Sequence, residues 1–168
     1  MKKFIIDADT GSDDAVAILL ALLHPQTEVL GITVVSGNVP LAQGITNTLS
    51  TIEIADQDIK VYAGADKPLV REYIEIHTLG EFTEHVKSLS PVSASAQSVH
   101  GVDGMGDIGI SSKTSEYEET GAVDYLIETI NNNPGEITLV TLGPLTNIAL
   151  AIEKDPSIGS KIDHCYVM

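Results

Sequence analysis

Strand-like and helix-like segments alternate along this chain, and the alternation limits its fold more than any other feature. Residues 4–6 are a short apolar run, and residues 29–35 (VLGITVV) are a continuous β-branched run, as found in parallel strands covered on both faces. Residues 13–23 and 40–55 have helical patterns. This order predicts an α/β fold, with an open, mostly parallel sheet and helices on both faces.

The rest of the chain continues the pattern after an irregular middle. Further segments predict a short strand, three helices and two more strands, in the order Lys60–Ala63, Leu79–Leu89 (helix), Ala122–Asn131 (helix), Ile137–Leu142, Leu145–Glu153 (helix) and His164–Met168. Residues 71–120 otherwise hold little regular structure. A segment of this kind is more often a lid or a binding loop than a simple connection.

The first predicted helix, residues 13–23, is apolar on most of its faces, so we expect it to be largely buried. Thr10 or Ser12 is expected to cap its amino end, and aspartates in the first turn suit the positive end of the helix dipole. Pro40 is expected at the first position of the second helix, where its fixed φ is well suited.

Charge and cysteine content restrict the partners and the compartment. The net charge of −15 argues against a nucleic acid or an anionic membrane as partner, because no basic patch is available to neutralise phosphates. Cys165 is the single cysteine, which favours a reducing compartment. The first apolar run is broken at Asp7, and no apolar stretch is long enough to span a bilayer. These features predict a cytoplasmic location.

Four aspartates are crowded between the first predicted strand and the first predicted helix. Asp7, Asp9, Asp13 and Asp14 occur within the stretch IIDADTGSDD. Buried like charges repel one another and resist desolvation unless they take up protons or bind a cation. The simpler alternative is that they are solvated loop charges and helix-start acids. Because apolar segments flank all four, we favour a site for a hard divalent cation such as Ca²⁺ or Mg²⁺.

Other motifs fit less well. Asp9-Thr10-Gly11 matches the triad of aspartic proteases, but those are all-β proteins, and a helix follows here. The Asp7-x-Asp9 pair of aspartyl phosphotransferases requires Thr or Val where this chain has Gly11. An EF-hand loop requires an acid at position 18, which is Ile18, and HGVDGMG lacks the spacing of a dinucleotide-binding loop.

The stretch DADTGSDDAVAILLAL resembles the D-x-D-x-G-x-D-D signature of the inosine-uridine-preferring nucleoside hydrolases. GITVVSGNVP, VYAGADKPLVR, VHGVDGMGD and ITLVTLGPLTNIALAIEKDP follow in the order of that family. Family members are roughly twice this length. Residues 1–168 are therefore interpreted as the N-terminal portion of a single nucleoside hydrolase domain, with no second domain.

The resemblance implies a Ca²⁺-dependent enzyme of nucleoside salvage, which uses water to split a ribonucleoside into ribose and a free purine or pyrimidine base. It implies that Asp9 binds the metal and acts as general base on the attacking water. Asp14 is implied as a second ligand, and Leu142 as a ligand through its backbone carbonyl. Asp7 is expected to support them by hydrogen bonding. A further ligand of the family lies beyond residue 168.

The resemblance also implies the residues that contact the substrate. Asp13 and Asn38 correspond to residues that bind the ribose, and Met168 to a methionine that lines the ribose pocket. His100 corresponds to a catalytic histidine over the base, although an ordinary surface histidine is the alternative. The family tends to form dimers or tetramers, so a homo-oligomer is expected.

One alternative from a different class stays open. This chain can instead be a catalytically inactive, truncated fragment that folds as a partial α/β domain and binds metal weakly at most. Hydrolysis of nucleosides in the presence and absence of a chelator distinguishes the two hypotheses.

Overall fold

The computed structural model describes residues 1–69 and 94–168 and contains a five-stranded sheet in the order β3-β2-β1-β4-β5. All four pairs of neighbouring strands are parallel. The strands are β1 (Lys2–Ala8), β2 (Thr27–Val34), β3 (Val61–Ala63), β4 (Ile137–Thr141) and β5 (Ile162–Val167). The predicted α/β class is confirmed, and each expected strand is found within a few residues of its predicted bounds.

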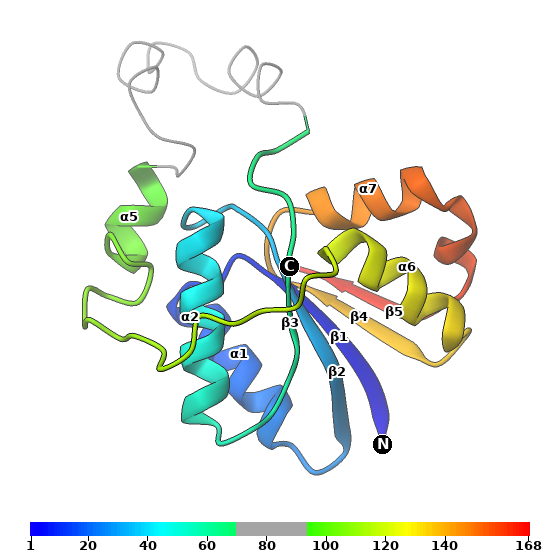
Figure 1. Cartoon of the computed structure of the whole chain (residues 1–168), viewed down its shortest axis with the longest axis horizontal. Helices are drawn as coiled ribbons and strands as arrows, with labels where there is room; N and C mark the ends of the chain where they lie inside the picture. The colour runs from blue at the N-terminus through cyan, green and yellow to red at the C-terminus, as the bar shows by residue number, and fades with distance from the viewer. Residues whose placement is uncertain (70–93) are drawn as a thin grey trace.

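Helices cover both faces of this sheet (Figure 1). The helices of the described residues are α1 (Ser12–Leu23), α2 (Leu41–Ile54), α5 (Ala94–His100), α6 (Ala122–Asn132), α7 (Thr146–Lys154) and a 3-10 turn, η1 (Pro156–Ser160). Ile6 belongs to the apolar cluster under α1 and α2, whereas Ile5 belongs to the cluster under α6 and α7. Neighbouring residues of β1 therefore anchor opposite layers, as the period of two of a strand requires.

The parallel arrangement brings the carboxyl ends of the strands to one edge. Leu142, just after β4, donates its backbone N–H to the carbonyl of Asp7 in β1, at 2.8 Å. Met168, just after β5, donates to the carbonyl of Thr141 at 3.0 Å. In sheets of this kind, ligands bind outside the carboxyl ends of the strands.

Helix α1 differs from the prediction in its cap and in its burial. Gly11, and neither Thr10 nor Ser12, is the N-cap residue, because the Asp14 carboxylate reaches back to the Gly11 N–H. Val16 and Leu20 have exposed fractions of 66% and 68%, so the expectation of a largely buried helix is wrong. One side of α1 packs on the sheet and α2, while Leu20 lines an apolar hollow of about 310 Å³.

The middle of the chain is less irregular than predicted where the structure describes it. Residues 94–100 form α5, which the serine- and alanine-rich sequence did not indicate. The expected helix at Leu79–Leu89 lies outside the described residues. Pro40 is the N-cap of α2 and not its first helical residue. In the parts of the chain that the structure covers, no helix is long and apolar enough to cross a membrane.

A glycine in β2 gives a test of the packing between the sheet and α6. A Cβ atom at Gly31 would press against the Tyr125 hydroxyl and lie 2.8 Å from its ring carbon Cζ. That ring is stacked on Tyr62, with centroids 3.6 Å apart, so it has little freedom to move. Gly31→Ala is expected to lower the free energy of unfolding by about 1–3 kcal/mol, measured by urea denaturation.

The matched control for this prediction is Gly159→Ala in η1. A Cβ atom there has no neighbour within 4 Å, so the change should stay within about 0.5 kcal/mol of the parent protein. Equal effects of the two substitutions would contradict the described packing of Tyr125 on β2.

Candidate functional site

Asp9 lies at the centre of the candidate site, one residue beyond the end of β1. Its side chain is buried, and Oδ2 accepts a hydrogen bond from the backbone N–H of Asn38 at 2.6 Å. Among the described residues, no N–H group donates to the other carboxylate oxygen, Oδ1. Burial raises the pKa of Asp9, so the residue has one oxygen held in place and one that lacks a donor.

Asp14 interacts directly with Asp9. It lies in the first turn of α1, its side chain is buried, and Oδ2 accepts the Gly11 N–H at 2.8 Å. Burial, with the negative charges of Asp9 and Asp13 adding to it, raises the pKa of Asp14 to about 7. A protonated Asp14 can donate to Asp9, whereas two ionised carboxylates repel each other. Either a proton or a cation relieves that repulsion.

Asp7 supports this arrangement from within β1. Its Oδ1 accepts hydrogen bonds from the Thr33 hydroxyl at 2.5 Å and from the Asn147 side-chain amide at 2.8 Å. Burial nevertheless raises the pKa of Asp7 to about 6. Its second oxygen has no donor among the residues that the structure describes. Two buried carboxylates therefore each keep one unpaired oxygen near the same edge of the sheet.

Two glycines allow the chain to pass close to Asp9. A Cβ atom at Gly37 would lie 2.8 Å from Asp9 Cγ, and one at Gly143 would lie 2.7 Å from Asp9 Oδ1. Both contacts are closer than real Cβ atoms make. The loops after β2 and β4 thus close around the carboxylate because neither glycine has a side chain.

His100, at the end of α5, is close to the first turn of α1, which carries Asp13. Its Nδ1 lies 3.0 Å from the Ser12 hydroxyl and 3.7 Å from an Asp13 carboxylate oxygen. The Asp13 side chain is 57% exposed, whereas that of His100 is 13% exposed. The structure therefore brings together Asp13, predicted to bind the ribose, and the predicted catalytic residue His100, which are far apart in the sequence, on the open side of the buried pair Asp9 and Asp14.

The other predicted residues follow three further strands at the same edge of the sheet. Asn38 is half-buried and contributes its backbone N–H to Asp9. Leu142 directly follows β4 and is hydrogen-bonded to the backbone of Asp7. Met168, beyond β5, is 74% exposed. Asn38 and Leu142 thus flank the end of β1 from either side, and Met168 lies one strand further along.

The donor atoms of this edge suit a hard cation but do not enclose one. Asp9 and Asp14 supply carboxylate oxygens, which Ca²⁺ and Mg²⁺ prefer. Within residues 1–69 and 94–168, no group of three or more His, Cys, Asp or Glu side chains is arranged to hold a metal ion. Ca²⁺ takes six to eight oxygen ligands, so backbone carbonyls, water or further residues would have to complete the shell.

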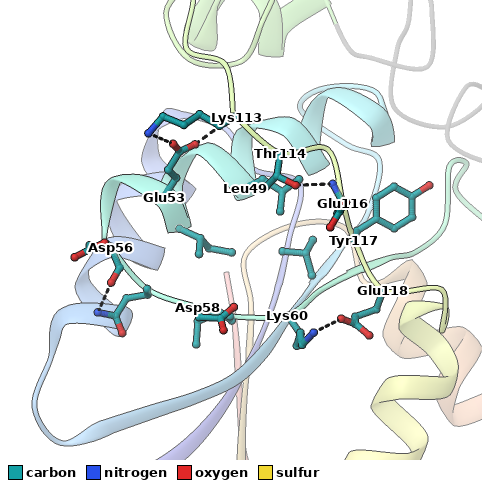
Figure 2. Close-up of a pocket in the computed structure, with 14 residues that line it drawn as sticks. Leu49, Glu53, Asp56, Asp58, Lys60, Lys113, Thr114, Glu116, Tyr117 and Glu118 are labelled. Atoms are coloured by element: carbon teal, nitrogen blue, oxygen red, sulfur yellow. Dashed lines mark hydrogen bonds and ion pairs between the residues drawn. The ribbon is translucent and has the colours of Figure 1, made fainter.

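A separate hollow of about 530 Å³ lies at the end of α2 and the amino end of β3 (Figure 2). Ion pairs of Lys113 with Glu53 and of Lys60 with Glu118, both at 2.6 Å, fasten residues 113–118 beside it. These groups are partly or largely exposed, and exposed pairs contribute little to stability. No unpaired buried oxygen lines this hollow in the described chain, which leaves the aspartate edge as the candidate site.

The sequence reasoning missed two buried asparagines that hold the site together. Asn147 in α7 donates to Asp7 and to the carbonyl of Val34, and its Oδ1 accepts the Ala65 N–H at 2.8 Å. Asn47 in α2 is equally buried. Both follow a threonine, and the apolar run Ile148–Ile152 comes directly after Asn147. Asparagine is seldom buried and is unfavourable in helix interiors, so its place before that run was the available signal for Asn147, whereas the polar surroundings of Asn47 gave none.

The fold and the site define an α/β protein with its acidic centre at the carboxyl ends of parallel strands, and comparisons place it in a family. The family model described as inosine-uridine preferring nucleoside hydrolase matches residues 4–168. A pyrimidine-specific ribonucleoside hydrolase of Escherichia coli is 35% identical over 167 residues, which cover 99% of this chain and 47% of that protein.

Solved structures of nucleoside hydrolases are similar to this chain in fold and sequence. A purine-preferring ribonucleoside hydrolase from Gardnerella vaginalis has a TM-score of 0.84 and 32% identity, covering 99% of this chain and 48% of that one. A plant nucleoside hydrolase has a TM-score of 0.79 and 36% identity, covering 99% and 47%. The chain belongs to the inosine-uridine preferring nucleoside hydrolase family, as its motifs predicted. It spans about half the length of the curated relatives it matches (47% of the E. coli protein).

The raised pKa of Asp14 predicts an unusual dependence of stability on pH in metal-free protein. The folded state holds a proton up to about pH 7, while the unfolded chain releases it near 3.8. The contribution of Asp14 to the stability of the fold is therefore fully present below pH 3.8 and is lost as the pH rises through about 7. In Asp14→Asn the side chain is always neutral. At pH 8, in the presence of chelator, the free energy of unfolding of this variant should exceed that of the parent protein by about 1–3 kcal/mol, as measured by urea denaturation.

The neighbouring substitution Asp13→Asn is the control, because it removes the same charge from a largely exposed side chain. It should change the free energy of unfolding much less than Asp14→Asn does. A stability that rises between pH 5 and 8 in the parent protein and in both variants would contradict the buried, protonated state of Asp14.

Proposed function

We propose that this chain carries the metal- and ribose-binding part of a Ca²⁺-dependent nucleoside hydrolase. The reaction adds water across the N-glycosidic bond of a ribonucleoside and yields ribose and the free base. The observation that carries the proposal is the pair of buried carboxylates, Asp9 and Asp14, of which Asp9 Oδ1 lacks a donor among the described residues. Buried carboxylates that destabilise the metal-free fold have no structural benefit, which favours a functional role.

Asp9 has the position that a general base requires. One of its oxygens is fixed by the Asn38 N–H, and the other is free to accept a proton from water. When bound, Ca²⁺ would bring a water molecule of lowered pKa and would orient the ribose hydroxyls. Asp14 and the Leu142 carbonyl are the proposed ligands beside Asp9. Asp7, fixed by Thr33 and Asn147, keeps the strand end in place.

The remaining proposed contacts address the substrate. Asp13, in the first turn of α1, is assigned to the ribose hydroxyls, and Asn38 and Met168 are assigned to the same sugar. His100 is assigned to the departing base. Positive charge develops on the ribose as the glycosidic bond breaks, so a ring of carboxylates stabilises the transition state more than the ground state.

A second candidate function is cation binding without turnover. The described residues offer two carboxylates and a carbonyl, and no cluster of three or more acidic or histidine side chains. The chain covers 47% of the E. coli relative. An α/β unit that binds Ca²⁺ and leaves nucleosides intact would match both observations.

Release of reducing sugar from uridine and inosine tests the first candidate. We expect release in the presence of Ca²⁺ and its loss after chelation, with recovery on addition of Ca²⁺. Asp9→Ala removes the general base and should lower the rate by about 100-fold or more. Ca²⁺ binding without any release of sugar would select the second candidate.

The exposed Asp66 provides a matched control, since Asp66→Asn removes one negative charge outside the aspartate cluster. Its rate should equal that of the parent protein. Hydrolysis that persists at full rate after removal of Ca²⁺, or in the Asp9 variant, would refute the proposed mechanism.

A further inference from the structure

We infer that Asn47 is a positioning residue that joins residues 9–11, between β1 and α1, to the loop of residues 101–107 and so fixes His100 over the site. The function of this contact rests on the proposed function, in which His100 faces the departing base. The contact itself rests on hydrogen bonds between described residues.

The Asn47 side chain lies between two loops that are far apart in the sequence. Its Nδ2 donates to the carbonyl of Thr10 at 2.9 Å and to the carbonyl of Asp103 at 2.8 Å. Its Oδ1 accepts from the Gln43 side chain at 2.9 Å. Only 1% of the residue is exposed. Both protons of the amide are thus used, one for each loop.

The 101–107 loop is seated on α2 through a glycine next to Asp103. Gly104 has a φ of +78°, and a Cβ atom there would lie 2.6 Å from the Val39 side chain and 3.1 Å from Asn47 Nδ2. Any side chain at this position would be strained and would separate the loop from Asn47. The close approach of this loop to α2 therefore depends on Gly104 in the loop and on the side-chain amide of Asn47 in the helix.

Hydrogen bonds within the loop connect this contact to His100. The Asp103 and Asp107 carboxylates accept backbone N–H groups across the loop, Asp103 from Met105 and Asp107 from Val102. Gly106 donates to the carbonyl of His100 at 2.7 Å. The backbone of His100 is therefore tied to the loop that Asn47 holds.

The other acceptor of Asn47, the carbonyl of Thr10, lies in the segment that leads to Ser12. Thr10 precedes Gly11 and Ser12, and the Ser12 hydroxyl is 3.0 Å from His100 Nδ1. The side-chain amide of Asn47 thus holds both the loop that is bonded to His100 and the segment before Ser12, which the His100 ring contacts. A carboxamide suits this place because it donates to two carbonyls, and an isosteric carboxylate would repel both.

Two substitutions should disrupt the contact from opposite sides. Asn47→Asp removes both donors at constant size, and Gly104→Ala adds the clashing Cβ atom. In each variant we expect amide exchange of residues 101–107 to quicken by about tenfold or more. The NMR contact between the His100 ring and Ser12, with its ring chemical shifts, should be lost, which a general loss of stability would not cause.

Gly109→Ala is the matched control. Gly109 also has a positive φ, +70°, but nothing lies within 4 Å of its Cβ position, so the His100 signals should stay as in the parent. Unchanged exchange and an intact His100–Ser12 contact in Asn47→Asp would overturn the inference, as would a uniform loss of protection across the sheet. Neither readout depends on turnover, so a failure of the proposed hydrolysis would be seen separately in the sugar assay.

Discussion

The burial of negative charge at the carboxyl end of β1 is the constraint on which the rest of this structure depends. Asp7, Asp9 and Asp14 are each at most 4% exposed, although a carboxylate withdrawn from water is costly unless it is paired. Hydrogen bonds from neighbouring residues offset part of that cost for each carboxylate. Gly11, the N-cap of α1, donates its N–H to Asp14, Asn38 after β2 donates one to Asp9, and Asn147 and Thr33 donate to Asp7. The oxygens that stay unpaired define where a proton or a cation is needed.

The same constraint explains features that have no obvious purpose when taken singly. Gly37 and Gly143 lack side chains because Asp9 occupies the space that a Cβ atom would need. Asn147 joins the ends of β1 and β2 and the segment after β3 through one side chain. Asn47 joins two further segments in the same way, residues 9–11 and the loop of residues 101–107. The core positions the carboxylates, and the two asparagines fix the loops around them.

The sheet and the acidic edge could be predicted from the sequence because both depend on local patterns. The run VLGITVV and its neighbours indicated parallel strands, and parallel strands place Asp9, Asn38 and Leu142 at one edge. The cap of α1 was misassigned because Asp14, three residues into the helix, competes with Thr10 and Ser12 for the role. The exposure of Leu20 and the hydrogen-bond partners of Asn47 and Asn147 depend on which elements pack together, and no local pattern specifies that.

Calorimetric titration of Ca²⁺ into the metal-free chain tests the central claim most directly, if it is done in buffers of different ionisation enthalpy. Asp14, with a pKa of about 7, must release its proton to bind the cation. The account predicts one binding site that releases close to one proton per Ca²⁺ at pH 6 and progressively less as the pH rises above 7. It also predicts that Asp14→Asn loses this release. Absence of binding, or binding without proton release at pH 6, would contradict the account.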